Sequence, residues 1–133
     1  MKKRYKVLII IFVVLVLAFV AFKIAFSKIE DNLKQLTLTE IADFDLTTAK
    51  DGSYNGSYSV FPVSVEVIVT IKDHAIIDID LIKHDNGKGQ SAEVITEKII
   101  AKQSLDVDLI SQATYSSKVI LKAVEDALIK ACS

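Results

Sequence analysis

The chain has 133 residues, of which 51% are hydrophobic, and one cysteine, Cys132. A single cysteine excludes an internal disulfide, a Cys-x-x-Cys-His haem site, an iron–sulfur cluster and a structural zinc finger. Residues 28–133 hold all 17 acidic residues but only 11 of the 16 basic ones, a formal net charge of −6. Such a charge disfavours nucleic acid and anionic lipid as partners.

The N-terminal segment is an apolar run, Val7–Phe22, which continues past Lys23 to Phe26. As a helix, residues 7–26 would measure about 30 Å, enough to cross a bilayer core. Residues 1–6 form a basic tail, which by the positive-inside rule stays cytoplasmic while the rest is exported. We therefore predict a single-pass anchor in the cell membrane with an extracytoplasmic C-terminal domain. A cleaved signal peptide is the alternative.

A linker and a single domain are predicted after the anchor. Apolar residues recur at helical spacing between residues 29 and 36, so residues 27–44 are interpreted as a stalk or linker, either helical or partly ordered. The pattern changes to strands near Asp51-Gly52, and residues 45–133 are predicted to form one domain. About 105 residues follow the anchor, enough for one small core.

Three strands are predicted in this domain. The first is Ser53–Val60, and the second, Val63–Ile71, alternates five β-branched residues with mostly polar ones. A tight turn at residues 72–75 leads to a return strand, in which Ile77, Ile79 and Leu81 are expected to share one face. Lys83–Gln90 is polar and is predicted to be a loop.

Two helices complete the predicted fold. Ser91 is expected to cap the first, whose apolar stripe includes Ile95 and Ile99. The second is predicted at about Ser117–Ala131. The fold class is thus α+β: a small antiparallel sheet packed by two helices, preceded by one N-terminal transmembrane helix.

The remaining histidine and aromatic residues are given structural interpretations. His84 is interpreted as a solvated loop residue in preference to a ligand contact, and neither His74 nor His84 has a carboxylate at a spacing suited to a metal site. The aromatic residues are interpreted as core residues in preference to stacking partners of a ring: these are Tyr54, Tyr58, Phe61 and Tyr115.

Residues 106–118 are the segment in which we predict a functional site. They place an acidic residue and several hydroxyl side chains just ahead of the last helix. Unpaired amides and the positive end of the helix dipole attract a phosphate group at such a place. A Ser-Ser pair before a helix is, however, most often only an N-cap.

The motif Asp108-Leu109-Ile110-Ser111-Gln112-Ala113-Thr114 resembles the Asp-x-x-Ser/Thr-Gly-Ala-Thr motif of the FMN-binding domain family. That family includes the C subunit of sodium-translocating NADH:quinone reductase, the equivalent subunit of Rnf complexes and small extracytoplasmic flavoproteins. The similarity extends over about residues 45–131, with the strands, the motif and the last helix in the family's order.

The resemblance implies that FMN is joined to Thr114 by a phosphoester bond, which a separate flavin transferase makes from FAD with a magnesium ion. Asp108, Ser111 and Ala113 match the other motif positions, and Ser116 and Ser117 would lie near the phosphate. The chain departs from the family at Gln112 and at His74 in the hairpin turn, where glycine is usual. Glycine allows a positive φ and a close approach.

The expected function is that of a membrane-anchored, extracytoplasmic FMN-binding electron-transfer protein, more a carrier than a stand-alone enzyme. Its partners would be the flavin transferase, a membrane electron donor and an extracytoplasmic acceptor. A non-redox interaction or regulatory module that has lost flavin is the alternative, and non-covalent FMN is a third possibility.

Overall fold

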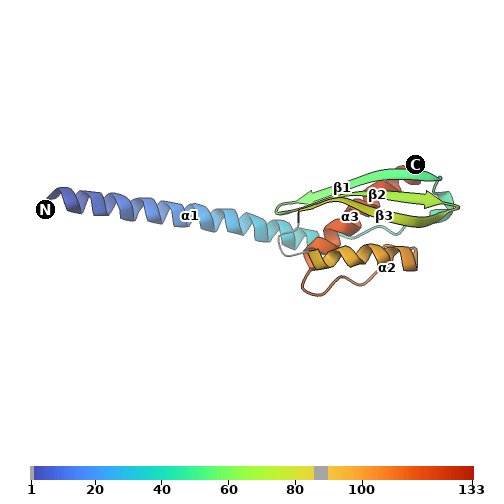
Figure 1. The fold of residues 1–133 in the computed structure, drawn as a ribbon. Helices are drawn as coiled ribbons and strands as arrows, with labels where there is room; N and C mark the ends of the chain where they lie inside the picture. Colours follow the sequence, from blue (N-terminus) through green and yellow to red (C-terminus); the bar gives the residue numbers. More distant parts are fainter. Residues whose placement is uncertain (1, 86–89) are drawn as a thin grey trace. The chain divides into compact units, whose positions relative to one another are not determined.

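The computed structural model describes residues 2–85 and 90–133. Their elements are, in order, α1 (Lys2–Leu38), η1 (Leu46–Thr48), β1 (Gly52–Val60), β2 (Val63–Lys72), β3 (Ala75–Asp85), η2 (Gln90–Val94), α2 (Ile95–Lys102) and α3 (Thr114–Ala131) (Figure 1). The chain divides into two compact units, Met1–Asn32 and Leu33–Ser133. Three strands with helices confirm the predicted α+β class.

The first unit consists of the long helix α1 up to Asn32. Its apolar side chains are exposed, and by length and composition it could cross a membrane, as predicted. The helix does not end with the apolar run. It continues into the predicted linker, residues 27–44, and ends at Leu38. Its last turns belong to the second unit, where Leu36 is only 2% exposed and is part of the core.

The second unit is built on an antiparallel sheet with the order β1-β2-β3. The burial of β2 alternates along the strand, because every second residue from Val63 to Ile71 faces the helices and is buried. Asp73 and His74 form the β2–β3 turn with positive φ values of 52° and 61°. Positive φ at both central residues gives a two-residue hairpin turn the twist that matches its strands.

Two bulges change which residues of β3 face the core. The register shifts by one residue at Thr70/Ile71 and again at Glu66/Val67, so Ile77 and Ile82 become extra residues on β3. Ile77 is 52% exposed, whereas its neighbour Ile76 is 2% exposed. The expectation that Ile77 shares the face of Ile79 and Leu81 is therefore wrong, because strict alternation does not hold across a bulge.

Helix α3 packs against β1 and β2, and α2 packs against β3, as Figure 1 shows. The approach of α3 to β1 is close, since a Cβ on Gly56 would lie 2.0 Å from the carbonyl oxygen of Ala123. Across the same contact, the Ser57 amide donates to Asp126 Oδ2 at 3.0 Å. Glycine at position 56 thus lets the helix lie directly on the strand backbone.

Some predicted boundaries are wrong. Lys83–Asp85 belong to β3 and not to a loop, while residues 86–89 of that predicted loop lie outside the described residues. Ser91 lies inside η2 and is not the cap of α2, whose N-cap is Val94. The last helix begins at Thr114, three residues before the predicted start.

Candidate functional site

Thr114 is the first residue of α3, and its side chain is exposed. The N-cap is Ala113, which provides no side-chain hydrogen bond. The first hydrogen bond of the helix runs from the Ser117 amide to the Ala113 carbonyl at 2.9 Å. The amides of Thr114, Tyr115 and Ser116 therefore have no intrahelical acceptor, which leaves them available to an anion.

The turn before Thr114 has a backbone conformation that favours glycine at position 112. The Ala113 amide donates to the Ile110 carbonyl at 3.0 Å, closing a four-residue turn. Gln112 is the third residue of this turn and has φ = 64°. A turn with positive φ at its third residue favours glycine there. Gln112 thus adopts a backbone conformation that glycine adopts readily, at a cost in strain.

The two serines have structural positions inside α3. Ser116 is 3% exposed and Ser117 is fully buried. The Ser117 hydroxyl donates to the Ala113 carbonyl at 2.7 Å and accepts from the Ile110 amide at 3.0 Å. Ser117 therefore fixes the turn that presents Thr114. The prediction that the pair precedes the helix, as a cap would, is wrong.

Asp108 and Ser111 lie on the exposed side of the segment that leads to this turn. Among the described residues neither side chain forms a hydrogen bond or an ion pair. Both lie within six residues of Thr114 along the chain, on the irregular segment between α2 and α3. They are accessible to an enzyme or ion that approaches the threonine.

The aromatic residues divide into two groups. Tyr54 and Tyr58 are partly buried against the core, as predicted; the Tyr54 hydroxyl donates to the Lys50 carbonyl, and Tyr58 lies under the Lys122 ammonium. Phe61 and Tyr115 are 67% and 42% exposed, so their interpretation as core residues is wrong.

His84 is not the solvated loop residue that was predicted. Its side chain is 3% exposed, and Nδ1 lies 3.1 Å from Glu93 Oε1. The bulge at Ile82 is the cause, because the added residue turns His84 inward, opposite Val65. In the described parts of the chain, no cluster of three or more metal-binding side chains occurs.

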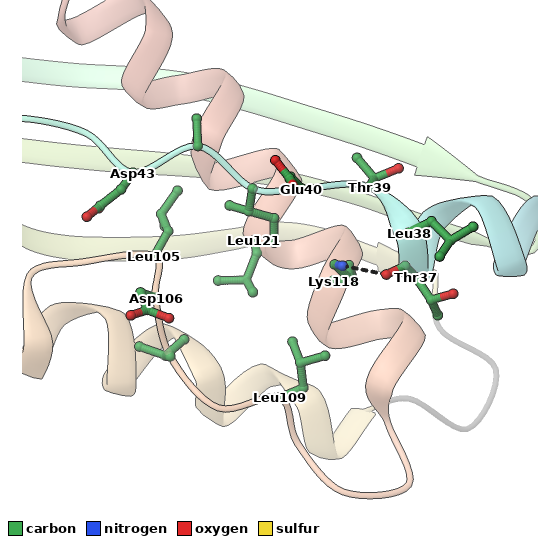
Figure 2. Close-up of a pocket in the computed structure, with 13 residues that line it drawn as sticks. Thr37, Leu38, Thr39, Glu40, Asp43, Leu105, Asp106, Leu109, Lys118 and Leu121 are labelled. Carbon is green, nitrogen blue, oxygen red and sulfur yellow. Dashed lines mark hydrogen bonds between the residues drawn. The ribbon is translucent and has the colours of Figure 1, made fainter.

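A groove of about 530 Å³ lies beside the motif, entirely within the second unit (Figure 2). One wall is residues 37–43, which begin with the last two residues of α1 and are called the N-terminal strap below. The other is residues 105–107 with Leu109, and Lys118 and Leu121 of α3 lie between the two. The sequence did not lead us to predict the strap as part of a site, although Lys118 follows Thr114 at helical i,i+4 spacing.

The sequence model of the FMN-binding domain family matches residues 62–129, which are half of the chain. An uncharacterized protein of Treponema pallidum (strain Nichols) is 33% identical over an alignment of 82 residues, and the alignment covers 59% of this chain. The chain spans only 23% of the length of that relative. The matched range contains the β2–β3 hairpin, the motif and nearly all of α3. The chain therefore belongs to the FMN-binding domain family.

Proposed function

We propose that this protein is a membrane-anchored, extracytoplasmic electron carrier whose FMN is joined to Thr114 by a phosphoester bond. The family membership supports FMN as the cofactor, and α1 fits a membrane anchor. The observation that carries the attachment site is an exposed threonine hydroxyl at a helix N-terminus that no side chain caps. A phosphate diester carries one negative charge, and the free amides of the first turn fit that charge.

The attachment step requires a separate enzyme, because a threonine hydroxyl is a weak nucleophile. A flavin transferase with a magnesium ion would bring FAD to Thr114. The Thr114 Oγ–phosphorus bond forms on the FMN side of the diphosphate, the bond to AMP breaks, AMP leaves and the hydroxyl proton is released. Asp108 and Ser111, both exposed, are the motif residues that the transferase can reach first.

Once FMN is attached, the flavin supplies the redox chemistry and the protein supplies position and electrostatics. A membrane-bound redox protein would act as reductant and an extracytoplasmic redox carrier as oxidant. The basic first residues of α1 support this topology, since Lys2, Lys3, Arg4 and Lys6 favour a cytoplasmic N-terminus.

Intact-mass spectrometry of the full-length protein, co-expressed with a flavin transferase, tests the proposal. We expect an FMN-sized adduct that is lost in Thr114→Ala. Thr47→Ala is the matched control, since it removes an exposed threonine hydroxyl outside the motif. An adduct that persists in Thr114→Ala would refute the assignment of the site.

A non-redox module is the second candidate, and Gln112 is the feature that favours it. Gln112 lies two residues before Thr114, and its side chain is exposed. It is bulkier than the glycine of the motif that this chain resembles, so it could obstruct the transferase or the phosphate. If Gln112→Gly acquires the adduct and the natural protein does not, the chain has kept the fold without the cofactor. Visible absorbance of the purified protein without an adduct would instead indicate non-covalent FMN.

A further inference from the structure

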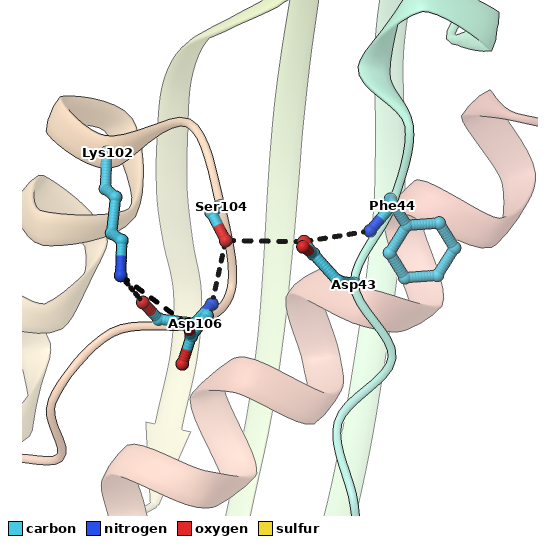
Figure 3. Close-up of polar contacts among 5 residues, drawn as sticks. All are labelled: Asp43, Phe44, Lys102, Ser104 and Asp106. Atoms are coloured by element: carbon cyan, nitrogen blue, oxygen red, sulfur yellow. Dashed lines mark hydrogen bonds and ion pairs between the residues drawn. The ribbon is translucent and has the colours of Figure 1, made fainter.

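Specific contacts fix both ends of the N-terminal strap, which forms one wall of the groove. At one end, Lys118 Nζ donates to the Thr37 carbonyl at 2.9 Å (Figure 2). At the other, the Ser104 hydroxyl donates to Asp43 Oδ1 at 3.3 Å (Figure 3). Ser104 also accepts the Asp106 amide at 3.0 Å, so the strap is tied to the opposite wall. These contacts make the groove a fixed feature of the second unit.

The middle of the strap offers an unused backbone edge. Residues 39–45 are extended or irregular, and among the described residues the backbone groups of Glu40, Ile41 and Ala42 make no hydrogen bonds. Ile41, Val107 and Leu109, which are partly or fully exposed, supply aliphatic surface to the groove, and the buried Leu105 and Leu121 lie beneath it. The groove thus combines apolar surface with a short row of free amides and carbonyls, and its volume is in the range of small-molecule sites.

Thr114 and the groove lie on the same side of α3. Lys118 follows Thr114 by four residues, so the two side chains are neighbours on one helix face, about 6 Å apart along the axis. Leu109, which belongs to the motif itself, also lines the groove. A group attached to Thr114 by a flexible chain can therefore reach into the groove.

We propose that this groove holds the isoalloxazine ring of the flavin carried on Thr114, an inference that rests on the proposed function. The ring is flat and apolar on its faces, which fits the aliphatic side chains. Its polar edge carries donors and acceptors, which fits the free backbone of Glu40–Ala42. The strap lies outside residues 62–129, so this part of the site is contributed by a segment that precedes the matched domain.

The charges at the groove assign an electrostatic role to Lys118. Its ammonium lines the groove, while the carboxylates of Glu40, Asp43 and Asp106 also line it. Reduction of the ring by two electrons with one proton adds one negative charge to it. The Lys118 ammonium stabilises that charge, and the three carboxylates oppose it.

The first test places a tryptophan in the groove, because the natural chain has none. Full-length protein carrying FMN is compared with Ala42→Trp and with Thr47→Trp, both at exposed positions but only the first in the groove. An indole in contact with the ring quenches flavin fluorescence by electron transfer, so we expect a several-fold loss in Ala42→Trp and little change in Thr47→Trp. Equal fluorescence in the two variants would overturn the inference.

The second test measures the midpoint potential of the attached flavin. Lys118→Met keeps the apolar stem and removes the charge, so we expect a more negative potential. Lys130→Met removes the same charge near the other end of α3 and should have a much smaller effect. Equal effects of the two variants would refute the role of Lys118. An adduct on Thr114 with no response in either test refutes the groove alone, whereas no adduct refutes the proposed function and this inference together.

Discussion

Replacing Gln112 by glycine should stabilise the protein. Gln112 has φ = 64°, and the left-handed region costs a residue with a side chain about 1–2 kcal/mol. Glycine removes that cost but loses about 0.5–1 kcal/mol more backbone entropy on folding. The Gln112 side chain is exposed and, in the described structure, forms no hydrogen bond, so nothing else is lost. The expected net gain in free energy of unfolding is about 1 kcal/mol.

Gln103 provides the matched control, because it is also a glutamine with positive φ, 55°. Its amide group, however, accepts from the Ile76 amide at 2.7 Å and donates to the carbonyls of Ile76 and Ile100. Gln103→Gly relieves the same strain but leaves a backbone amide unpaired, which costs about 1–3 kcal/mol, besides the lost bonds to the carbonyls. This variant should therefore be less stable than the natural protein.

Both variants can be measured in detergent by urea unfolding followed through tyrosine fluorescence, and by thermal melting. A gain of 1 kcal/mol raises the melting temperature of a domain of this size by about 4–8 °C. Opposite shifts for Gln112→Gly and Gln103→Gly are the expected result. No gain for Gln112→Gly would refute the argument that glutamine is strained at this turn.

Three further outcomes follow from other contacts. Ser117→Ala removes the acceptor of the Ile110 amide and should destabilise the domain by about 1–3 kcal/mol in the same urea assay; an unchanged midpoint would contradict its role. Gly56→Ala places a Cβ 2.0 Å from a helix carbonyl oxygen and should destabilise by about 3 kcal/mol or more, with a normal midpoint as the contrary result. The Thr47 hydroxyl and, to a lesser extent, the Thr47 amide donate hydrogen bonds to Asp45 and lower the pKa of its carboxyl group. The ionised Asp45 therefore stabilises the fold slightly at neutral pH, and this contribution is lost as the pH falls through the lowered pKa. Thr47→Val should raise the pKa in an NMR titration, and an unchanged value would contradict this cause.

The class and order of the elements were predictable because their signals are local. β2 alternates β-branched and polar residues along nearly its whole length, and the apolar face of α3 repeats at helical spacing. The motif also pointed to Thr114 before any geometry was known. These features depend on neighbours in the chain, which the sequence displays directly.

The predictions were wrong where tertiary contacts determine the local structure. The bulges turn Ile77 outward and His84 inward. They depend on how β2 and β3 pair, and no residue type in β3 indicates their positions. The start of α3 at Thr114 depends on the buried Ser117 hydroxyl. In the sequence this serine resembles an N-cap, which led to a helix start predicted three residues too late. The groove wall at residues 37–43 was not predicted, because it depends on Lys118 reaching a carbonyl 81 residues away.

The two bulges of β3 have a consequence for neighbouring molecules. In the described sheet β3 is an edge strand, and a long, regular edge invites another chain to add a strand. The extra residues Ile77 and Ile82 interrupt the even row of amides and carbonyls that such pairing needs. Copies anchored by α1, as proposed, would be concentrated on one membrane surface, where they would meet often. Two interruptions within one strand help to keep their sheets from joining edge to edge.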